Sequence, residues 1–168
     1  MYFDGSYRES HGAASGGVVI YDTKGVLVRK QGLKLDAKSN NEAEYMTFQN
    51  RLRMCRQLGI HFLRIRGDAL LVVKQVLGVW KNKNPRLRTL CVQVKQLLKR
   101  FEAWSIMHID RSQNEEAHNA AQNMIMEVFV MRANEPWYHG RETLSKKLSS
   151  CNQVFCQKIS CHKKSMHL

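Results

Sequence analysis

The pattern of apolar and polar residues in the first part of the chain predicts short strands joined by tight turns. Apolar, β-branched and aromatic residues gather at 1–7, at 18–21 and from 26 to 28, and turn-prone segments separate them. One such segment, 12–17, contains only small residues and is expected to be a turn rather than part of a strand. The three apolar runs therefore predict an antiparallel meander.

A helical pattern follows the meander. Behind Ser39, apolar residues recur every three or four positions, which is typical of a helix with one buried face. Ser39 and Glu42 match a capping box, in which side chains satisfy free backbone N–H groups at the helix start. Gly59 is suited to end this helix. The clearest helix in the chain begins at Asn84 and Pro85 and has an unbroken apolar stripe.

The remaining elements alternate between strand and helix. Residues 62–66 predict a fourth strand, residues 70–77 suit a short helix, and residues 104–108 predict a fifth strand. Ser112 or Asn114 is expected to cap a last helix. This order predicts an α/β domain with a five-stranded mixed sheet flanked by helices, in which three antiparallel strands are followed by parallel strands.

The chain is expected to form one folded domain and a tail. Periodicity fades near its end, so residues 1–132 are predicted to fold and residues 133–168 to be a basic, disordered tail. The tail holds the pattern C-x4-C-x4-C-H-x4-H, made by Cys151, Cys156, Cys161, His162 and His167. Zinc sites usually begin with closer cysteine pairs, so a loose tail is preferred to a metal knuckle. Cys55 and Cys91 lie on apolar helix faces, which favours a reducing, intracellular compartment.

The charge of the chain changes this picture by suggesting a partner. Lys and Arg number 27 against 14 Asp and Glu, a formal net charge of +13, which favours nucleic acid. A basic tail on an ordinary domain explains only part of this charge, because many cations lie in mid-chain: Lys74, Lys81, Lys83, Arg86, Arg88, Lys95, Lys99 and Arg100. No apolar run is long enough to span a membrane, and the start shows no secretory signal. We expect a monomer without a small-molecule cofactor.

Three acids occupy positions that suggest a metal site. Asp4 lies within the first predicted strand, Glu44 in the first turn of the first helix, and Asp68 at the end of the fourth strand. If the first and fourth strands are neighbours, the three carboxylates converge and repel one another unless a cation lies between them. Hard oxygen ligands favour magnesium or manganese. Taken singly, each acid has a simpler interpretation: a turn residue, a helix-dipole acid and a helix N-cap.

Several motifs in order resemble the type 1 ribonuclease H family. Segments 4–6, 40–44 and 66–73 read DGS, NNEAE and RGDALLVV, and each contains one of the three acids. Segment 111–117 reads RSQNEEA and matches the spacing of the family's final-helix motif. The resemblance covers residues 2–127, and it is strongest to the reverse-transcriptase-like ribonuclease H domains of plants and retroelements.

The resemblance implies an endonuclease that cuts the RNA strand of RNA/DNA hybrids. It implies two magnesium ions, with manganese as an alternative, held by Asp4, Glu44 and Asp68. These ions would activate water and give 5′-phosphate and 3′-hydroxyl products. The nucleic-acid contacts implied by the resemblance, or suggested by basic and aromatic character, are Gly5, Ser6, Asn40, Asn41, Trp80, Lys81, Lys83, Arg111 and Asn114. Capping is an alternative role for the two asparagines of the first helix, and core packing is one for the tryptophan.

Two histidines complete the expected site. The family usually has a fourth acid directly after the residue matching Ala117, and this chain has His118 there. His118 is a candidate metal ligand or proton acceptor, but it supplies no negative charge, so a weak or inactive nucleic-acid-binding module is the alternative function. His108 matches the family's accessory loop histidine, and a strand-end residue is the equal alternative. A domain of a retroelement polyprotein would have the same chemistry in another context.

Overall fold

The computed structural model describes residues 1–133, apart from the side chains of His11 and of residues 126–133. The expected tail and its Cys/His pattern lie outside the described residues. The elements in chain order are β1 Tyr2–Arg8, η1 Glu9–His11, β2 Ala13–Tyr21, β3 Leu27–Leu35, α1 Asn40–Gln57, β4 Phe62–Gly67, α2 Leu70–Val76, α3 Pro85–Leu98, β5 Ala103–His108, η2 Arg111–Gln113 and α4 Glu115–Ala133, where η marks a 3-10 helix.

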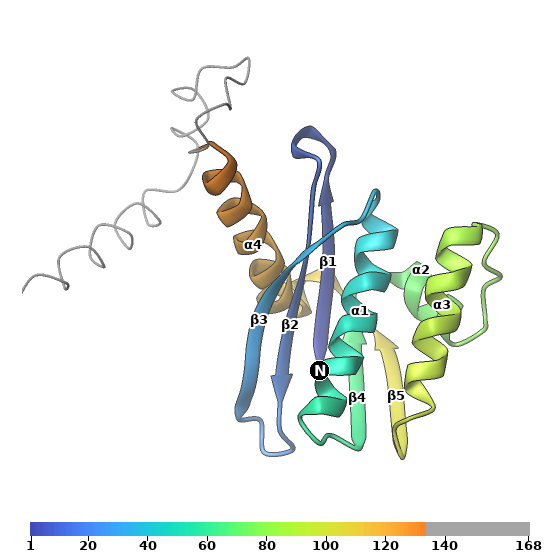
Figure 1. The fold of residues 1–168 in the computed structure, drawn as a ribbon. Helices are drawn as coiled ribbons and strands as arrows, with labels where there is room; N and C mark the ends of the chain where they lie inside the picture. Colours follow the sequence, from blue (N-terminus) through green and yellow to red (C-terminus); the bar gives the residue numbers. More distant parts are fainter. Residues whose placement is uncertain (134–168) are drawn as a thin grey trace, which may run out of the picture. The chain divides into compact units, whose positions relative to one another are not determined.

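The five strands form one mixed sheet in the order β3-β2-β1-β4-β5. The three N-terminal strands pair antiparallel, whereas β4 pairs in parallel with β1 on one side and with β5 on the other. Helices α1, α2 and α3 cover one face, and α4 packs on the other face against β1, β2 and β3 (Figure 1). The predicted α/β architecture, with three antiparallel strands followed by parallel ones, is confirmed.

The second strand differs from the sequence prediction. Residues 13–17 were expected in a turn, but they belong to β2, which runs from Ala13 to Tyr21. The small residues are required by the helices that pack there. A Cβ atom at Gly16 would lie 2.1 Å from the Thr47 Oγ1 atom of α1, and one at Gly17 would lie 1.9 Å from the backbone oxygen of Ala117 in α4. The small residues of β2 are therefore explained by the close packing of α1 and α4 against this strand.

The start of α1 follows a modified capping box. The Ser39 hydroxyl accepts a hydrogen bond from the Glu42 N–H group at 3.2 Å, as the pattern predicts. The Glu42 carboxylate, however, accepts from the N–H group of Lys38 at 2.8 Å and not from Ser39. After Leu58, Gly59 takes a positive φ of 72°, which ends the helix where expected.

The main core lies between the sheet and α1, α2 and α3. Phe3 of β1 stacks on Phe48 of α1 with ring centroids 4.6 Å apart, and both side chains are fully buried. Cys55 and Cys91 are buried free thiols within this core. Among the helices of residues 1–133, none has the length and apolar character needed to cross a membrane.

Candidate functional site

Three elements bring the acids Asp4, Glu44 and Asp68 together, and we call these residues the acid cluster. Tyr2 and Phe3 of β1 pair with Arg66 and Gly67 of β4, so Asp4 and Asp68 follow at the same end of adjacent parallel strands. Glu44 approaches from the first turns of α1. One oxygen from each of the three carboxylates lies within 4.8 Å of the other two. Strand pairing thus joins residues that are 64 positions apart in the sequence.

Gly5 explains how Glu44 reaches the cluster. A Cβ atom at Gly5 would lie 2.3 Å from the backbone nitrogen of Glu44, which leaves no room for any side chain there. Because Gly5 directly follows Asp4, the close approach of α1 to β1 places Glu44 beside Asp4. The glycine of the DGS motif therefore has a packing role in addition to any contact with nucleic acid.

The electrostatics of the acid cluster suit a bound cation. Burial raises the pKa of Glu44 well above its usual value, and the charges of Asp4 and Asp68 raise it further. Burial also raises the pKa of Asp4, although a hydrogen bond from His118 opposes this. The Glu44 Oε2 atom is buried without a hydrogen-bond partner. A divalent cation would satisfy that oxygen and offset the repulsion among the carboxylates, so these residues fit a hard metal ion.

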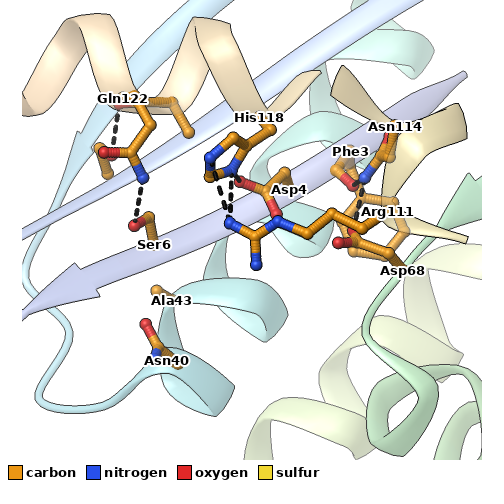
Figure 2. A network of polar contacts seen from close by, with 12 residues as sticks. Phe3, Asp4, Ser6, Asn40, Ala43, Asp68, Arg111, Asn114, His118 and Gln122 are labelled. Atoms are coloured by element: carbon orange, nitrogen blue, oxygen red, sulfur yellow. Dashed lines mark hydrogen bonds and ion pairs between the residues drawn. The ribbon is translucent and has the colours of Figure 1, made fainter. Parts of the chain in front are cut away.

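Asn114 orients Asp68. It is 1% exposed, and its amide nitrogen donates to the Phe3 carbonyl at 2.8 Å and to Asp68 Oδ1 at 2.6 Å (Figure 2). Asn114 precedes α4, and its carbonyl accepts from the N–H group of His118, but its side chain turns to the acid cluster. Of the two residues expected to cap the last helix, Asn114 holds the position directly before α4, whereas Ser112 lies in η2.

His118 joins the site through Asp4 and Arg111. The His118 Nδ1 atom lies 3.0 Å from Asp4 Oδ2, and Nε2 lies 3.1 Å from the Arg111 Nη2 atom (Figure 2). A guanidinium only donates and a carboxylate only accepts. A neutral imidazole with its proton on Nδ1 satisfies both contacts. Both ring nitrogens are thus engaged by protein groups, and His118 as a metal ligand stays a prediction.

The other predicted residues lie on the elements around the acid cluster. Gly5 and Ser6 continue β1 beyond Asp4, and Asn40 and Asn41 begin α1. Ser39 provides the cap, which leaves Asn40 to accept a hydrogen bond from the Tyr7 N–H group at 2.8 Å.

The basic connection and the second histidine lie outside the acid cluster. Trp80 is 45% exposed on the segment between α2 and α3, together with exposed Lys81 and Lys83, so it is not a core residue. His108 is exposed at the end of β5, opposite Gly67 of β4. Its accessory role stays a prediction.

Two residues near the site were not predicted from the sequence. Arg8 and Gln122 are hydrogen-bonded to each other, and Gln122 also donates to Ser6 at 2.9 Å (Figure 2). Gln122 lies one helical turn after His118, and this spacing is the sequence signal that would have identified it.

Comparison with known proteins identifies relatives of most of the chain. A family model described as reverse transcriptase-like matches residues 2–124. The ribonuclease HI of Halobacterium salinarum is 37% identical over 116 residues, which are 69% of this chain and 58% of that protein. An uncharacterised protein of Bacillus subtilis is 31% identical over 137 residues, or 77% of this chain and 60% of that protein. The chain therefore spans less than two thirds of either relative.

Solved structures share the fold. The RNase H1 of Halobacterium salinarum is 35% identical with a TM-score of 0.72, and the match covers 75% of this chain and 96% of that one. LC11-RNase H1, solved in complex with an RNA/DNA hybrid, is 28% identical with a TM-score of 0.71, and the match covers 76% of this chain and 96% of that one. The predicted ribonuclease H-like fold is confirmed.

Proposed function

The chain belongs to the reverse transcriptase-like family, and on this basis we propose that it hydrolyses the RNA strand of RNA/DNA hybrids at internal phosphodiester bonds. The acid cluster is the observation that carries this proposal. Three converging carboxylates with an unsatisfied buried oxygen, in a chain of net charge +13, suit hydrolysis of a polyanion at a metal centre.

We infer that Asp4, Glu44 and Asp68 hold two magnesium ions, with manganese as a substitute. When bound, such ions activate a water molecule and neutralise the leaving oxygen. Asn114 fixes one Asp68 oxygen through its 2.6 Å hydrogen bond, which leaves the remaining oxygen of that carboxylate to the metal. Arg111 donates to His118 and holds the imidazole against Asp4.

The direct test is cleavage of an end-labelled RNA/DNA hybrid in magnesium and in manganese. We expect internal cuts in the RNA strand only, with 5′-phosphate and 3′-hydroxyl ends. Double-stranded DNA of the same sequence is the control substrate. A protein that binds the hybrid without cutting it in either metal would contradict the enzymatic proposal.

Binding of the hybrid is proposed to extend to the basic segment after α2. The amide of Gln75 organises this segment: its nitrogen donates to the Lys81 carbonyl at 3.4 Å, and its oxygen accepts from Asn82 at 3.1 Å. Because the segment is anchored in this way, Trp80, Lys81 and Lys83 can present an aromatic ring and two charges in a fixed arrangement. An aromatic ring with flanking cations suits a nucleic-acid strand, because the ring can stack on a base while the cations contact backbone phosphates.

Replacing both Lys81 and Lys83 with Ala should weaken hybrid binding and reduce its dependence on salt. Each phosphate contact releases counterions, so the slope of log affinity against log salt should fall by about 1.5 in magnitude. Fluorescence anisotropy at several salt concentrations measures both effects. Lys24 and Arg29, exposed on the β2–β3 hairpin, are the matched control because their double Ala variant removes the same charge. An equal slope in both double variants would place the contact surface elsewhere.

A second candidate function is nucleic-acid binding with little or no catalysis. The observation that favours it is His118, which places an imidazole rather than a fourth carboxylate beside Asp4. With fewer negative charges the second magnesium ion should bind weakly, whereas manganese accepts nitrogen ligands more readily. Cleavage is therefore expected to be slower in magnesium than in manganese.

Replacing His118 with Asp should raise cleavage in magnesium by about tenfold, which corresponds to about 1.4 kcal/mol of barrier. The new carboxylate would supply an oxygen ligand at the position where the imidazole now contacts Asp4. Single-turnover rates in both metals measure this effect. His118→Asn is the matched control, since it has the same size as the Asp variant without the charge. Equal rates in the Asp and Asn variants would show that the missing charge does not limit the reaction.

A further inference from the structure

Beyond the acid cluster, polar side chains continue along the line where β1 meets α4, which we call the β1–α4 seam. Asp4, Ser6 and Arg8 alternate along β1 and face the same side of the sheet, and His118 and Gln122 are one turn apart on α4. Two residues advance about 6.6 Å along a strand and four residues advance about 6 Å along a helix. Successive side chains of β1 and α4 therefore stay opposite one another. His118 therefore contacts Asp4 while Gln122 contacts Ser6 (Figure 2).

The hydrogen bonds of the seam fix the orientation of each polar group. The Arg8 guanidinium can only donate, so the Gln122 atom that it contacts must be the amide oxygen. The amide nitrogen of Gln122 then donates to the Ser6 oxygen at 2.9 Å. Ser6 therefore uses its oxygen as an acceptor inside the protein, which leaves its hydroxyl proton for an acceptor outside.

Asn40 lies on the other side of β1, and its side-chain acceptor is also engaged within the protein (Figure 2). Its side-chain oxygen accepts from the backbone N–H group of Tyr7 at 2.8 Å. Because a backbone N–H group can only donate, the exposed end of Asn40 is its NH2 group. The acceptor atoms of Asn40, Gln122 and Ser6 are thus all engaged within the protein.

These groups present hydrogen-bond donors beside a cluster of carboxylates. We propose that Arg8, Ser6 and Asn40, with Gln122 as a positioning residue, form a phosphate-binding subsite for a phosphodiester next to the one held at the acid cluster. The exposed Arg8 supplies the positive charge, and Gln122 holds both Arg8 and Ser6 in place. This inference rests on the proposed function and assigns new roles to Arg8 and Gln122.

The test neutralises one phosphate of the hybrid at a time. Each hybrid carries one methylphosphonate at a chosen position of one strand. It is titrated with the full-length Asp68→Asn variant, which leaves the duplex uncut. We expect one position near the cleavage site to weaken binding by roughly tenfold, as for a hydrogen bond to a charged group. In Arg8→Met and Gln122→Met versions that position should lose most of its effect, because the charged contact is already absent or no longer held in place.

A second test compares hybrid binding by the Gln122→Glu variant with binding by Gln122→Met. The new carboxylate would accept from both Arg8 and Ser6, so the Ser6 proton would turn inward and the Arg8 charge would be neutralised. Binding should weaken by more than in Gln122→Met. Asn123→Glu adds the same charge at an exposed neighbour on α4 and should weaken binding less. Thermal unfolding verifies that each variant is folded, and Arg8→Met tests the exposed end of the network if the Gln122 variants unfold.

The possible results separate this subsite from the proposed function. A methylphosphonate profile that is the same in parent, Arg8→Met and Gln122→Met would overturn the subsite while hybrid binding stands. A loss in Asn123→Glu equal to that in Gln122→Glu would reduce the effect to general charge and would also overturn it. A parent chain that binds no hybrid would refute the proposed function and this subsite with it.

Discussion

Replacing Asp68 with Asn should reduce hybrid cleavage by on the order of 1000-fold or more while leaving hybrid binding intact or tighter. The substitution deletes a metal ligand from the acid cluster, and metal-assisted charge stabilisation contributes several kcal/mol to the barrier. It also removes a negative charge that repels the phosphate. The amide oxygen can still accept from Asn114, so the fold should not change.

The measurement is the single-turnover cleavage rate together with the affinity for the uncut hybrid. Asp110→Asn is the matched control, because Asp110 is exposed just before η2 and outside the acid cluster. The control should cut at the parent rate. An Asp68→Asn variant that also cuts at the parent rate would show that the acid cluster is not the metal site.

Replacing Gly17 with Ala should destabilise the domain by about 3 kcal/mol or more. The added Cβ atom would lie 1.9 Å from the Ala117 carbonyl oxygen and 2.7 Å from the Ala121 nitrogen, so the backbone of α4 would have to move. Gly17 pairs with Asp4 in the sheet, and His118 follows Ala117 on the helix. The same displacement should therefore separate His118 from Asp4 and reduce cleavage.

Thermal and denaturant unfolding measure this loss, and Gly25→Ala separates it from ordinary backbone strain. Gly25 has a φ of 81°, and a Cβ atom there would meet no other atom within 4 Å. Its substitution should therefore cost about 1 kcal/mol of strain without a clash. If the two variants unfold alike, the close approach of α4 to β2 is not what Gly17 provides.

Local patterns in the sequence were sufficient to predict most elements. Ser39 and Gly59 bound α1 because their roles depend on nearby backbone groups alone, and Asn84 with Pro85 starts α3 for the same reason. The glycines of β2 gave the wrong prediction. Their conformations are those of a strand, and the reason for their small size is a helix 100 residues away at Ala117, which no local pattern contains.

The identity of the acids was available from the sequence, but their common site depends on tertiary structure. Asp4, Glu44 and Asp68 each have a simple local role in isolation, and only the parallel pairing of β1 with β4 and the approach of α1 at Gly5 place their oxygens within 4.8 Å. The unpartnered Glu44 oxygen and the raised pKa of that carboxyl follow from burial, which is a property of the packed structure.

The sequence by itself determined the order of elements, the basic charge and the residue types of the acid cluster, because these depend on composition and on short-range periodicity. Only the tertiary structure decided which residues share the site. It set Asn114 on Asp68, engaged both nitrogens of His118 and joined Arg8 to Gln122. The contacts of His118 and Gln122 arise where α4 packs on β1, and α4 can approach the sheet this closely because Gly17 of β2 and Gly32 of β3 carry no side chain beneath it.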